Sequence, residues 1–421
     1  MNSPEIAQHL EMDYTDPIRD PLWSHIYLSP AMMRLTNTAE FQQLSRIKQL
    51  GPTFLVYPGA THTRLNHSLG VFHIARRIMS RLVRHPETPS LTLPGVKAFL
   101  AASLLHDVGH FPYTHSFKSL PLAEHEHLTG RYVQHGELAR HIRDDLRVDP
   151  AMVAAIVDES LPAQGNDEIR LYRSLLSGSL DPDKLDYLNR DAYFCGVPYG
   201  LQDIDFALSR LVPVGYEGLG LEESGVSAVE NILFSKYLMY RAVYWHRTVR
   251  VATAMIKKSI HQGLQDDVIQ PEELYGLDDE LFFSRFAGHP YPPFELISQV
   301  AARRLLKPAA DIAYDATNPG HAKLTQIAAR HALEAALAQE LRIPDYQVII
   351  DLPDPVSFEA HFPIFVDGEP HEFAEKSVFS TDVVARFTET IRRIRLMIPH
   401  TVSDALPDPR ATLEAAIADV V

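Results

Sequence analysis

Apolar residues recur at spacings of three and four up to about residue 340, and this pattern predicts a chain built mainly of α-helices. Residues 96–108 are apolar on nearly every face, so we expect that helix to be buried on all sides. Asn37 and Thr38 suit a helix cap, and Gly51 suits a helix stop. The other helices are expected at residues 31–50, 68–84, 124–144, 183–194, 227–264 and 321–341.

Strand-like runs appear only in the second half of the chain, where proline also becomes dense. They lie at residues 346–352, 361–367 and 392–398. The pattern therefore predicts a mainly α fold in two parts. An all-helical body covers residues 1–310, and a smaller mixed α+β lobe covers residues 311–421.

Composition indicates a globular chain with a large core. Of the 421 residues, 46% are hydrophobic and 22% are charged. The longest apolar run, residues 96–105, has about half the length that a bilayer-spanning helix needs. The N-terminal residues are acidic, unlike a secretory leader. We therefore expect a soluble cytoplasmic protein without membrane contact.

Charge and cysteine content narrow the range of ligands. The formal net charge of −15 repels a phosphate backbone at long range, which argues against duplex nucleic acid as a partner. A small anion stays compatible, because a bound metal ion supplies positive charge locally. The single cysteine, Cys195, permits neither an intrachain disulfide nor a cysteine-based metal cluster. Any metal must therefore be held by imidazole and carboxylate groups.

Histidines are concentrated in one stretch, with seven of the 21 between residues 106 and 141. His106 and Asp107 stand together at the end of the buried apolar run. A buried carboxylate is costly unless a cation compensates it, and a metal binds neutral imidazoles and ionised carboxylates. An isolated pair of this kind can also be an ordinary cap or salt bridge, so both interpretations stay open.

Two further segments carry candidate ligands. GATHTRLNHSLGV places His67 at a helix start and Arg64 three positions earlier, although a helix-start residue and a surface charge are the plain alternative. In the segment that follows residue 178, Asp181 predicts a helix cap and puts Asp183 in the first turn. The helix dipole favours an acid there with or without a metal.

The same helix carries Lys184, Tyr187 and Asp191 at spacings of three and four, which forms one polar stripe. Together with the motifs HSLGV and HDVGH, this segment, DPDKLDYLNRD, resembles the HD-domain phosphohydrolases. The resemblance is closest to the deoxynucleotide triphosphohydrolases, which include bacterial dGTPases and the vertebrate SAM-and-HD-domain enzyme. It extends from about residue 15 to about residue 260, with its core motifs in residues 49–191, while the C-terminal residues match only loosely.

This resemblance implies one divalent metal ion, with manganese, iron, magnesium, nickel and zinc as candidates. Its ligands would be His67, His106, Asp107 and Asp183. Such an ion polarises a phosphoryl group and lowers the pKa of a bound water.

The resemblance also implies roles for the residues around the metal. His125 falls at the position of the family's catalytic histidine, and His110 and His115 would lie beside it. The implied substrate contacts are Arg64, Lys184, Tyr187 and Lys236 for the phosphates, Gln49, Asp191 and Tyr244 for the sugar, and Leu50 beside Gln49.

Several positions depart from the family pattern. The family's HxxD motif, whose aspartate pairs with the catalytic histidine, reads HSFK here, with Lys118 in the acid's place. A cation there would lower the pKa of the catalytic histidine and make it a poorer acid near neutral pH. Asn37 and Ser45 replace the aspartate and arginine that read a guanine effector, and Trp245 replaces a glutamine beside Tyr244.

The implied function is hydrolysis of dNTPs to deoxynucleoside and triphosphate. The implied partners are a dNTP substrate, a candidate nucleotide effector and further copies of the chain in a dimer or tetramer. Two alternatives stay open. One is an HD phosphodiesterase, nuclease or other nucleotide phosphatase, and the other is a catalytically weak, nucleotide-binding regulatory protein.

Overall fold

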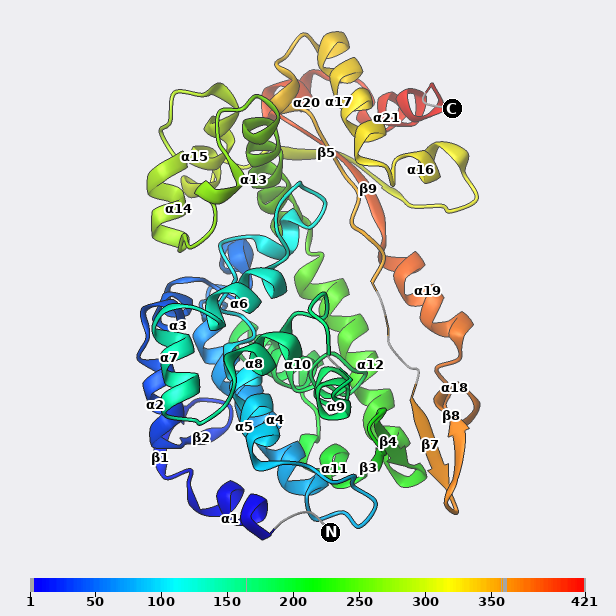
Figure 1. Ribbon diagram of the computed structural model, residues 1–421. Helices are drawn as coiled ribbons and strands as arrows, with labels where there is room; N and C mark the ends of the chain where they lie inside the picture. Colours follow the sequence, from blue (N-terminus) through cyan, green and yellow to red (C-terminus); the bar gives the residue numbers. More distant parts are fainter. Residues whose placement is uncertain (1–3, 164, 357, 359–361, 420–421) are drawn as a thin grey trace.

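The computed structural model describes residues 4–163, 165–356, 358 and 362–419, and it confirms a mainly α fold (Figure 1). Helix α5 (Leu93–Leu105) is the centre of the N-terminal body, and from Val96 to Leu105 only Lys97 is not buried. The other helices of the body are α1 (Pro4–Met12), α2 (Pro30–Thr36), α3 (Ala39–Gln43), α4 (Arg64–Leu82), α6 (His125–Val133), α7 (Gly136–Asp144), α8 (Pro150–Val157), α9 (Asp167–Leu176), α10 (Pro182–Cys195), α11 (Ile204–Ser209) and α12 (Val226–Met239).

Two of the expected long helices are interrupted. The segment 31–50 divides into α2, α3 and a 3₁₀ turn at Leu44–Arg46, with Asn37 ending α2 and Thr38 starting α3. The segment 227–264 divides at a π-helical turn, Tyr240–Tyr244. The His246 side chain then caps α13 (Arg247–Gln265) by accepting a hydrogen bond from the Thr248 N–H.

The expectation that strands are confined to the second half of the chain is wrong. Strands β1 (Asp16–Asp20) and β2 (Ser24–Leu28) form an antiparallel hairpin near the N-terminus. Its turn is built by Asp20, whose carboxylate accepts hydrogen bonds from the N–H groups of Leu22 and Trp23. A second hairpin, β3 (Leu211–Val214) and β4 (Gly218–Glu222), also belongs to the body, which is therefore not all-helical.

The C-terminal residues build two further apolar cores. One joins α13 to α14 (Asp279–Phe286) and α15 (Glu295–Ala301). The other lies under a three-stranded antiparallel sheet of order β5–β9–β6, which confirms the strands predicted at 346–352 and 392–398. The elements of this second core are β5 (Lys307–Ala313), α16 (Pro319–Lys323), α17 (Ile327–Leu341), β6 (Ile349–Asp351), β9 (Arg393–Ile398), α20 (His400–Ala405) and α21 (Pro409–Ala418).

Between β6 and β9 the chain returns to the body (Figure 1). Strand β7 (Pro363–Val366) pairs in parallel with β4 and antiparallel with β8 (Glu369–Glu372). Its described residues confirm the core of the strand predicted at 361–367, whereas His361 lies outside the described residues. Helices α18 (Phe373–Lys376) and α19 (Thr381–Ile391) follow β8. The stretch from β7 to α19 packs on the core of the N-terminal body. The predicted domain boundary at residue 310 stays a prediction.

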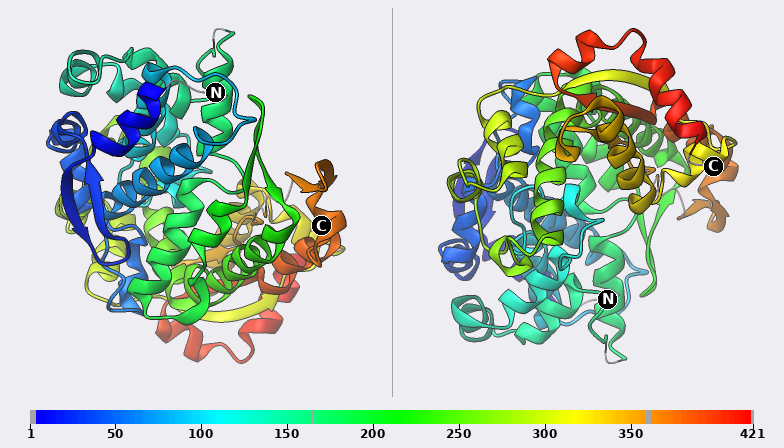
Figure 2. Two further views of the ribbon diagram at one scale, coloured as in Figure 1. Left: turned by 90° about the horizontal axis from the view of Figure 1, so that it is seen from below. Right: turned by 90° about the horizontal axis from the view of Figure 1, so that it is seen from above.

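Helix α13 connects these parts. It contacts the body through the 3₁₀ turns η2 (Gly51–Leu55) and η3 (Thr114–Phe117), and it contacts the C-terminal sheet through β5 and β6. Figure 1 shows α1 and α21 at opposite ends of the molecule, and Figure 2 shows the molecule from each of these two ends. Among the described residues, no helix has the length and apolar character needed to span a bilayer.

Candidate metal centre and active site

The structure brings the four predicted metal ligands together. His67 lies in the first turn of α4, His106 ends α5 with Asp107 next to it, and Asp183 lies in the first turn of α10. The ligand atoms of His67, His106 and Asp107 lie within 4.8 Å of one another. Asp183 Oδ1 is 2.8 Å from His67 Nε2, and its side chain is 41% exposed, so the cluster opens on that side.

Both histidines present the nitrogen that a metal requires. His106 Nδ1 lies 3.0 Å from the Ser103 carbonyl oxygen, which can only accept, so Nδ1 carries the proton and Nε2 keeps its lone pair. His106 Nε2 is buried and has no hydrogen-bond partner among the described residues. A divalent cation bound by two imidazoles and two carboxylates fits this unpaired atom and this donor set.

Asp186 holds the second histidine, and the sequence analysis missed it. Its carboxylate is 2.9 Å from His67 Nδ1, which directs Nε2 towards the cluster. Burial lowers the pKa of His67, but its contacts with Asp183 and Asp186 raise it to about 10. A cation that binds at Nε2 must therefore displace a proton.

Asp186 is itself fixed by a buried network. It accepts hydrogen bonds from Trp23 Nε1 at 2.6 Å and from Arg190 Nε at 2.7 Å. Arg190 also donates to Asp20, so the β1–β2 hairpin supports the metal centre. A Cβ at Gly70 would lie only 1.9 Å from Asp186 Oδ1, which explains a glycine in the HSLGV motif.

Asp107 is the most enclosed carboxylate of the cluster. Arg64 Nη1 donates to its Oδ2 at 2.9 Å, and His110 Nδ1 lies 3.0 Å from its Oδ1. Burial would raise the pKa of Asp107, but His110, His106 and Arg64 lower it well below its usual range. The structure thus places Arg64 on one of the predicted metal ligands, and its contact with a substrate phosphate stays a prediction.

A second cluster adjoins the metal ligands through His110. The ring nitrogens of His110, His115 and His125 lie within 4.8 Å of one another, with 3.2 Å between His110 Nε2 and His115 Nε2. His110 and His125 are buried, whereas His115 is exposed. Burial and then Arg64 hold the pKa of His110 well below its usual range, so it is neutral at physiological pH.

Glu126 is a further residue that the sequence analysis missed. It follows His125 in the first turn of α6, and its Oε2 lies 3.0 Å from His125 Nδ1. Burial would raise the pKa of Glu126, but the contact with His125 and, more weakly, the charge of Lys118 lower it to about 2. Lys118 itself is exposed at the end of the 3₁₀ turn η3.

Gly109 lets the two clusters approach each other. A Cβ at this position would lie 2.2 Å from the His125 carbonyl oxygen and 2.6 Å from the Thr129 nitrogen. The Thr129 hydroxyl accepts a hydrogen bond from the Gly109 N–H and donates one to the His106 carbonyl. Helix α6 is therefore locked onto the HDVGH turn, and the glycine explains why it can come so close.

We expect Gly109→Ala to separate these clusters. The methyl group forces α6 away, and overpacking of this kind costs about 1–3 kcal/mol of folding free energy. Chemical denaturation should show that loss, and turnover should fall because His125 moves with α6. A variant with unchanged stability and turnover would contradict the packing described here.

Two of the three predicted sugar-binding residues, Asp191 and Tyr244, form one hydrogen-bonded group with His62. Tyr244 donates to Asp191 at 2.7 Å, and His62 Nε2 lies 2.8 Å from the other Asp191 oxygen. The rings of Tyr187 and Tyr244 meet edge to face with centroids 6.4 Å apart. His62 thus supports Asp191. In this segment the predicted site residues were Arg64 and His67, not His62.

The remaining predicted substrate residues are more dispersed. Gln49 and Leu50 are half-buried, and Gln49 Oε1 has no hydrogen-bond partner among the described residues. Lys184 Nζ lies 2.6 Å from Asp181 Oδ2, and Lys236 is buried with its ammonium 5.4 Å from the Phe358 ring. Their contacts with substrate stay predictions.

Residues 64–173 match the HD domain family, and residues 209–404 match the HD associated region. Asp183 falls between these two matches. In a solved structure of a hypothetical protein from Aquifex aeolicus, the fold is similar over 96% of this chain and 99% of that chain, with a TM-score of 0.71 and 25% identity.

Curated relatives are similar over part of their length. The uncharacterized protein YwfO of Bacillus subtilis is 36% identical over 250 residues, which is 59% of this chain and 55% of the relative. The deoxynucleoside triphosphate triphosphohydrolase SAMHD1 of Danio rerio is 27% identical over 289 residues, which is 60% of this chain and 46% of the relative. The chain thus spans about half the length of these relatives.

Proposed function

Since the chain belongs to the HD-domain phosphohydrolases, we propose that it hydrolyses nucleotides in a metal-dependent reaction, with dNTPs cleaved to deoxynucleoside and triphosphate. One observation carries this proposal: the two-histidine, two-aspartate cluster lies directly beside three further histidines. The name of the Danio rerio relative supports dNTPs as the substrate class.

The cluster ligands and their neighbours have distinct tasks in this reaction. A divalent cation held by His67, His106, Asp107 and Asp183 would polarise a phosphoryl oxygen and lower the pKa of a bound water. Arg64 keeps the Asp107 carboxylate ionised and oriented.

His125 is the candidate general acid. When the bond between the α-phosphorus and the sugar oxygen breaks, the leaving oxygen needs a proton, and the imidazole can donate it from Nε2. Glu126 stands at Nδ1 on the opposite side of the ring, where its carboxylate can hold the imidazole in position. Glu126 therefore fills the role of the aspartate that Lys118 replaces.

A product assay tests the proposed reaction. The purified protein is incubated with each dNTP and a divalent cation, and triphosphate, pyrophosphate and phosphate are separated. Deoxynucleoside and triphosphate in equal amounts are the expected products. Release of pyrophosphate or phosphate, or cleavage of RNA or cyclic dinucleotides only, would favour the phosphodiesterase, nuclease or phosphatase alternative, and no product would favour the regulatory one.

We expect turnover that does not depend on GTP or dGTP. Asn37 and Ser45 are exposed and uncharged, and the Ser45 hydroxyl donates to the Gln42 carbonyl of the preceding helix α3. An arginine contact to a nucleotide is worth about 1.5–3 kcal/mol, and this chain lacks one at position 45. Rates measured with and without GTP should agree within error. Size-exclusion chromatography with and without GTP should show the same oligomeric state, which we predict to be a homo-oligomer. Strict dependence on a guanine nucleotide would show that other residues have taken over the role.

A further inference from the structure

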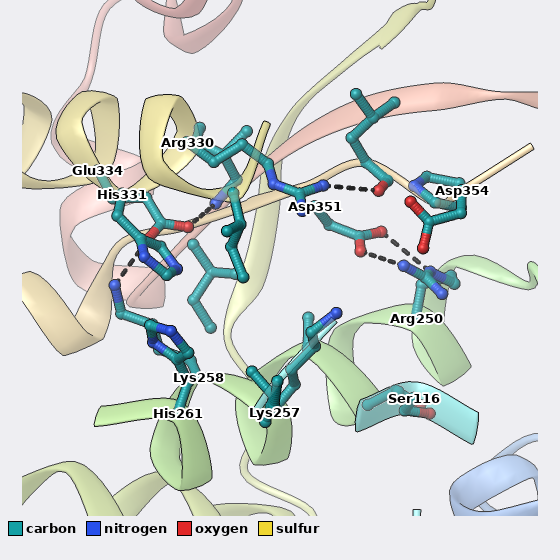
Figure 3. A pocket seen from close by; sticks show the side chains of 18 of the residues that line it. Ser116, Arg250, Lys257, Lys258, His261, Arg330, His331, Glu334, Asp351 and Asp354 are labelled. Atoms are coloured by element: carbon teal, nitrogen blue, oxygen red, sulfur yellow. Dashed lines mark hydrogen bonds and ion pairs between the residues drawn. The ribbon is translucent and has the colours of Figure 1, made fainter. Parts of the chain in front are cut away.

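A cavity of about 110 Å³ lies outside the metal cluster, between α13, α17 and the segment that runs from β6 to Asp354 (Figure 3). His115 and Ser116 line one side, so the cavity adjoins the histidine cluster. About 10–15 Å³ of such space admits one water, and this cavity therefore has room for a group of several heavy atoms.

The wall of the cavity is rich in permanent positive charge. Four cations face three carboxylates and three histidines; the cations are Arg250, Lys257, Lys258 and Arg330, the carboxylates Glu334, Asp351 and Asp354, and the histidines His115, His261 and His331. Two of the carboxylates are already neutralised. Lys258 Nζ lies 2.6 Å from Glu334, and Arg250 donates to Asp351.

Lys257 and Arg330 are the two cations of the wall that form no ion pair with a described carboxylate, and Lys257 is the ammonium of the two. It is half-buried on α13, and no carboxylate among the described residues lies within ion-pair distance. Figure 3 shows it pointing into the cavity, with Arg330 across from it. Burial and then the charges of Arg330 and Arg250 lower the pKa of Lys257 to about 8.

Other polar atoms in the wall are also available. Arg330 uses Nη1 to donate to the Leu352 carbonyl at 3.0 Å, which fixes the orientation of the guanidinium beside the cavity. His261 is buried, and its Nδ1 has no hydrogen-bond partner among the described residues. An unpaired ammonium beside cations held at fixed positions favours the binding of an anion, because each cation can donate a charge-assisted hydrogen bond to it.

We propose that this cavity is a second binding site, separate from the metal centre, for an anion that carries phosphate groups. Arg330 and Lys257 would grip its oxygens, and the bound anion would neutralise the surplus charge. Both an inorganic polyphosphate and the phosphate chain of a nucleotide have this chemistry. Such a site is independent of the phosphohydrolase activity proposed above, although its occupant would lie against His115.

Calorimetric titration with tripolyphosphate and with dATP tests this site. The His106→Ala variant serves as the titrated protein, because it lacks a metal ligand and leaves the cavity unchanged. We expect it to bind one anion per chain, and we expect Lys257→Met in the same background to weaken that binding at least tenfold. Arg143→Met, which removes an exposed cation on α7, is the matched control and should bind as its parent does. Equal affinity for both ligands identifies the phosphate chain as what is recognised, and tighter dATP binding identifies a nucleotide as the occupant.

Thermal unfolding adds a second readout. Lys257→Met removes an ammonium from a half-buried position, so the midpoint should rise in the absence of ligand, while tripolyphosphate should stabilise only proteins that keep Lys257. No anion binding by His106→Ala, or undiminished binding after Lys257→Met, would overturn the proposed site. A lower midpoint for Lys257→Met without ligand would likewise overturn it, because the lysine would then be a structural residue.

Discussion

Replacing His106 or Asp183 by alanine is expected to abolish both metal binding and hydrolysis. His106 contributes an unpaired Nε2, and Asp183 contributes the exposed carboxylate on the open side of the cluster. Loss of either leaves an incomplete ligand set, so metal content by elemental analysis should fall from one ion per chain to none. Activity should fall below detection, since the water loses its activating ion.

Two comparisons make this result specific. Asp167→Ala removes another first-turn aspartate, at the start of α9, and should keep both metal and activity. Asp186→Asn keeps all four ligands but weakens the support of His67, and a change of this kind costs about 10–100-fold in metal affinity. Full metal content in His106→Ala or Asp183→Ala would contradict the ligand set, and two ions per chain in the unmodified protein would assign a second metal to His110, His115 and His125.

The local positions of the four predicted metal ligands could be expected from the sequence. Asp181 caps α10 through the Lys184 N–H, which puts Asp183 in the first turn as expected. His106 and Asp107 follow a helix whose residues are apolar on nearly every face. The assignment of the four residues to one ion came from the resemblance to the HD-domain phosphohydrolases, because local spacing alone left an ordinary cap, salt bridge or surface charge open.

The support of these ligands was not predictable in the same way. Asp186 lies between two predicted site residues on α10, but its partner Trp23, and the Asp20 that binds Arg190, come from a hairpin more than 160 positions earlier. That hairpin has strands of five residues only, too short to establish an alternating pattern. Glu126 was not predicted as a site residue either. A carboxylate in the first turn of a helix is common, because it interacts favourably with the helix dipole, so its presence does not indicate a site.

The path of the C-terminal segment depends on tertiary contacts. Strand β7 was predicted from its apolar residues, but its parallel pairing with β4 joins Leu221 to Ile364. Neither strand alone identifies that partner, because the hydrogen-bond register is set by packing against the body's core. The pattern therefore predicted the strand and not the side of the molecule to which it belongs.

Glu126→Gln is expected to lower kcat for dNTP hydrolysis about tenfold at neutral pH. The carboxylate lies 3.0 Å from His125 Nδ1 and holds the imidazole that donates to the leaving oxygen. Glutamine keeps the shape and removes the charge, so the imidazole loses the contact that positions it. The value of kcat should therefore fall, while KM changes little. Unchanged kcat would show that Glu126 does not support His125.

Lys118→Asp tests whether Glu126 or Lys118 has the larger effect on His125. Lys118 is exposed and its charge acts on Glu126 and His115, so with Glu126 present the new aspartate should change kcat much less than Glu126→Gln does. In the Glu126→Gln background the same substitution restores a carboxylate near His125, and turnover should recover in part. Lys118→Ala, which removes the cation without adding an acid, is the control and should not rescue. If Lys118→Asp and Lys118→Ala instead raise KM alike with kcat unchanged, Lys118 binds a substrate phosphate and does not act on His125.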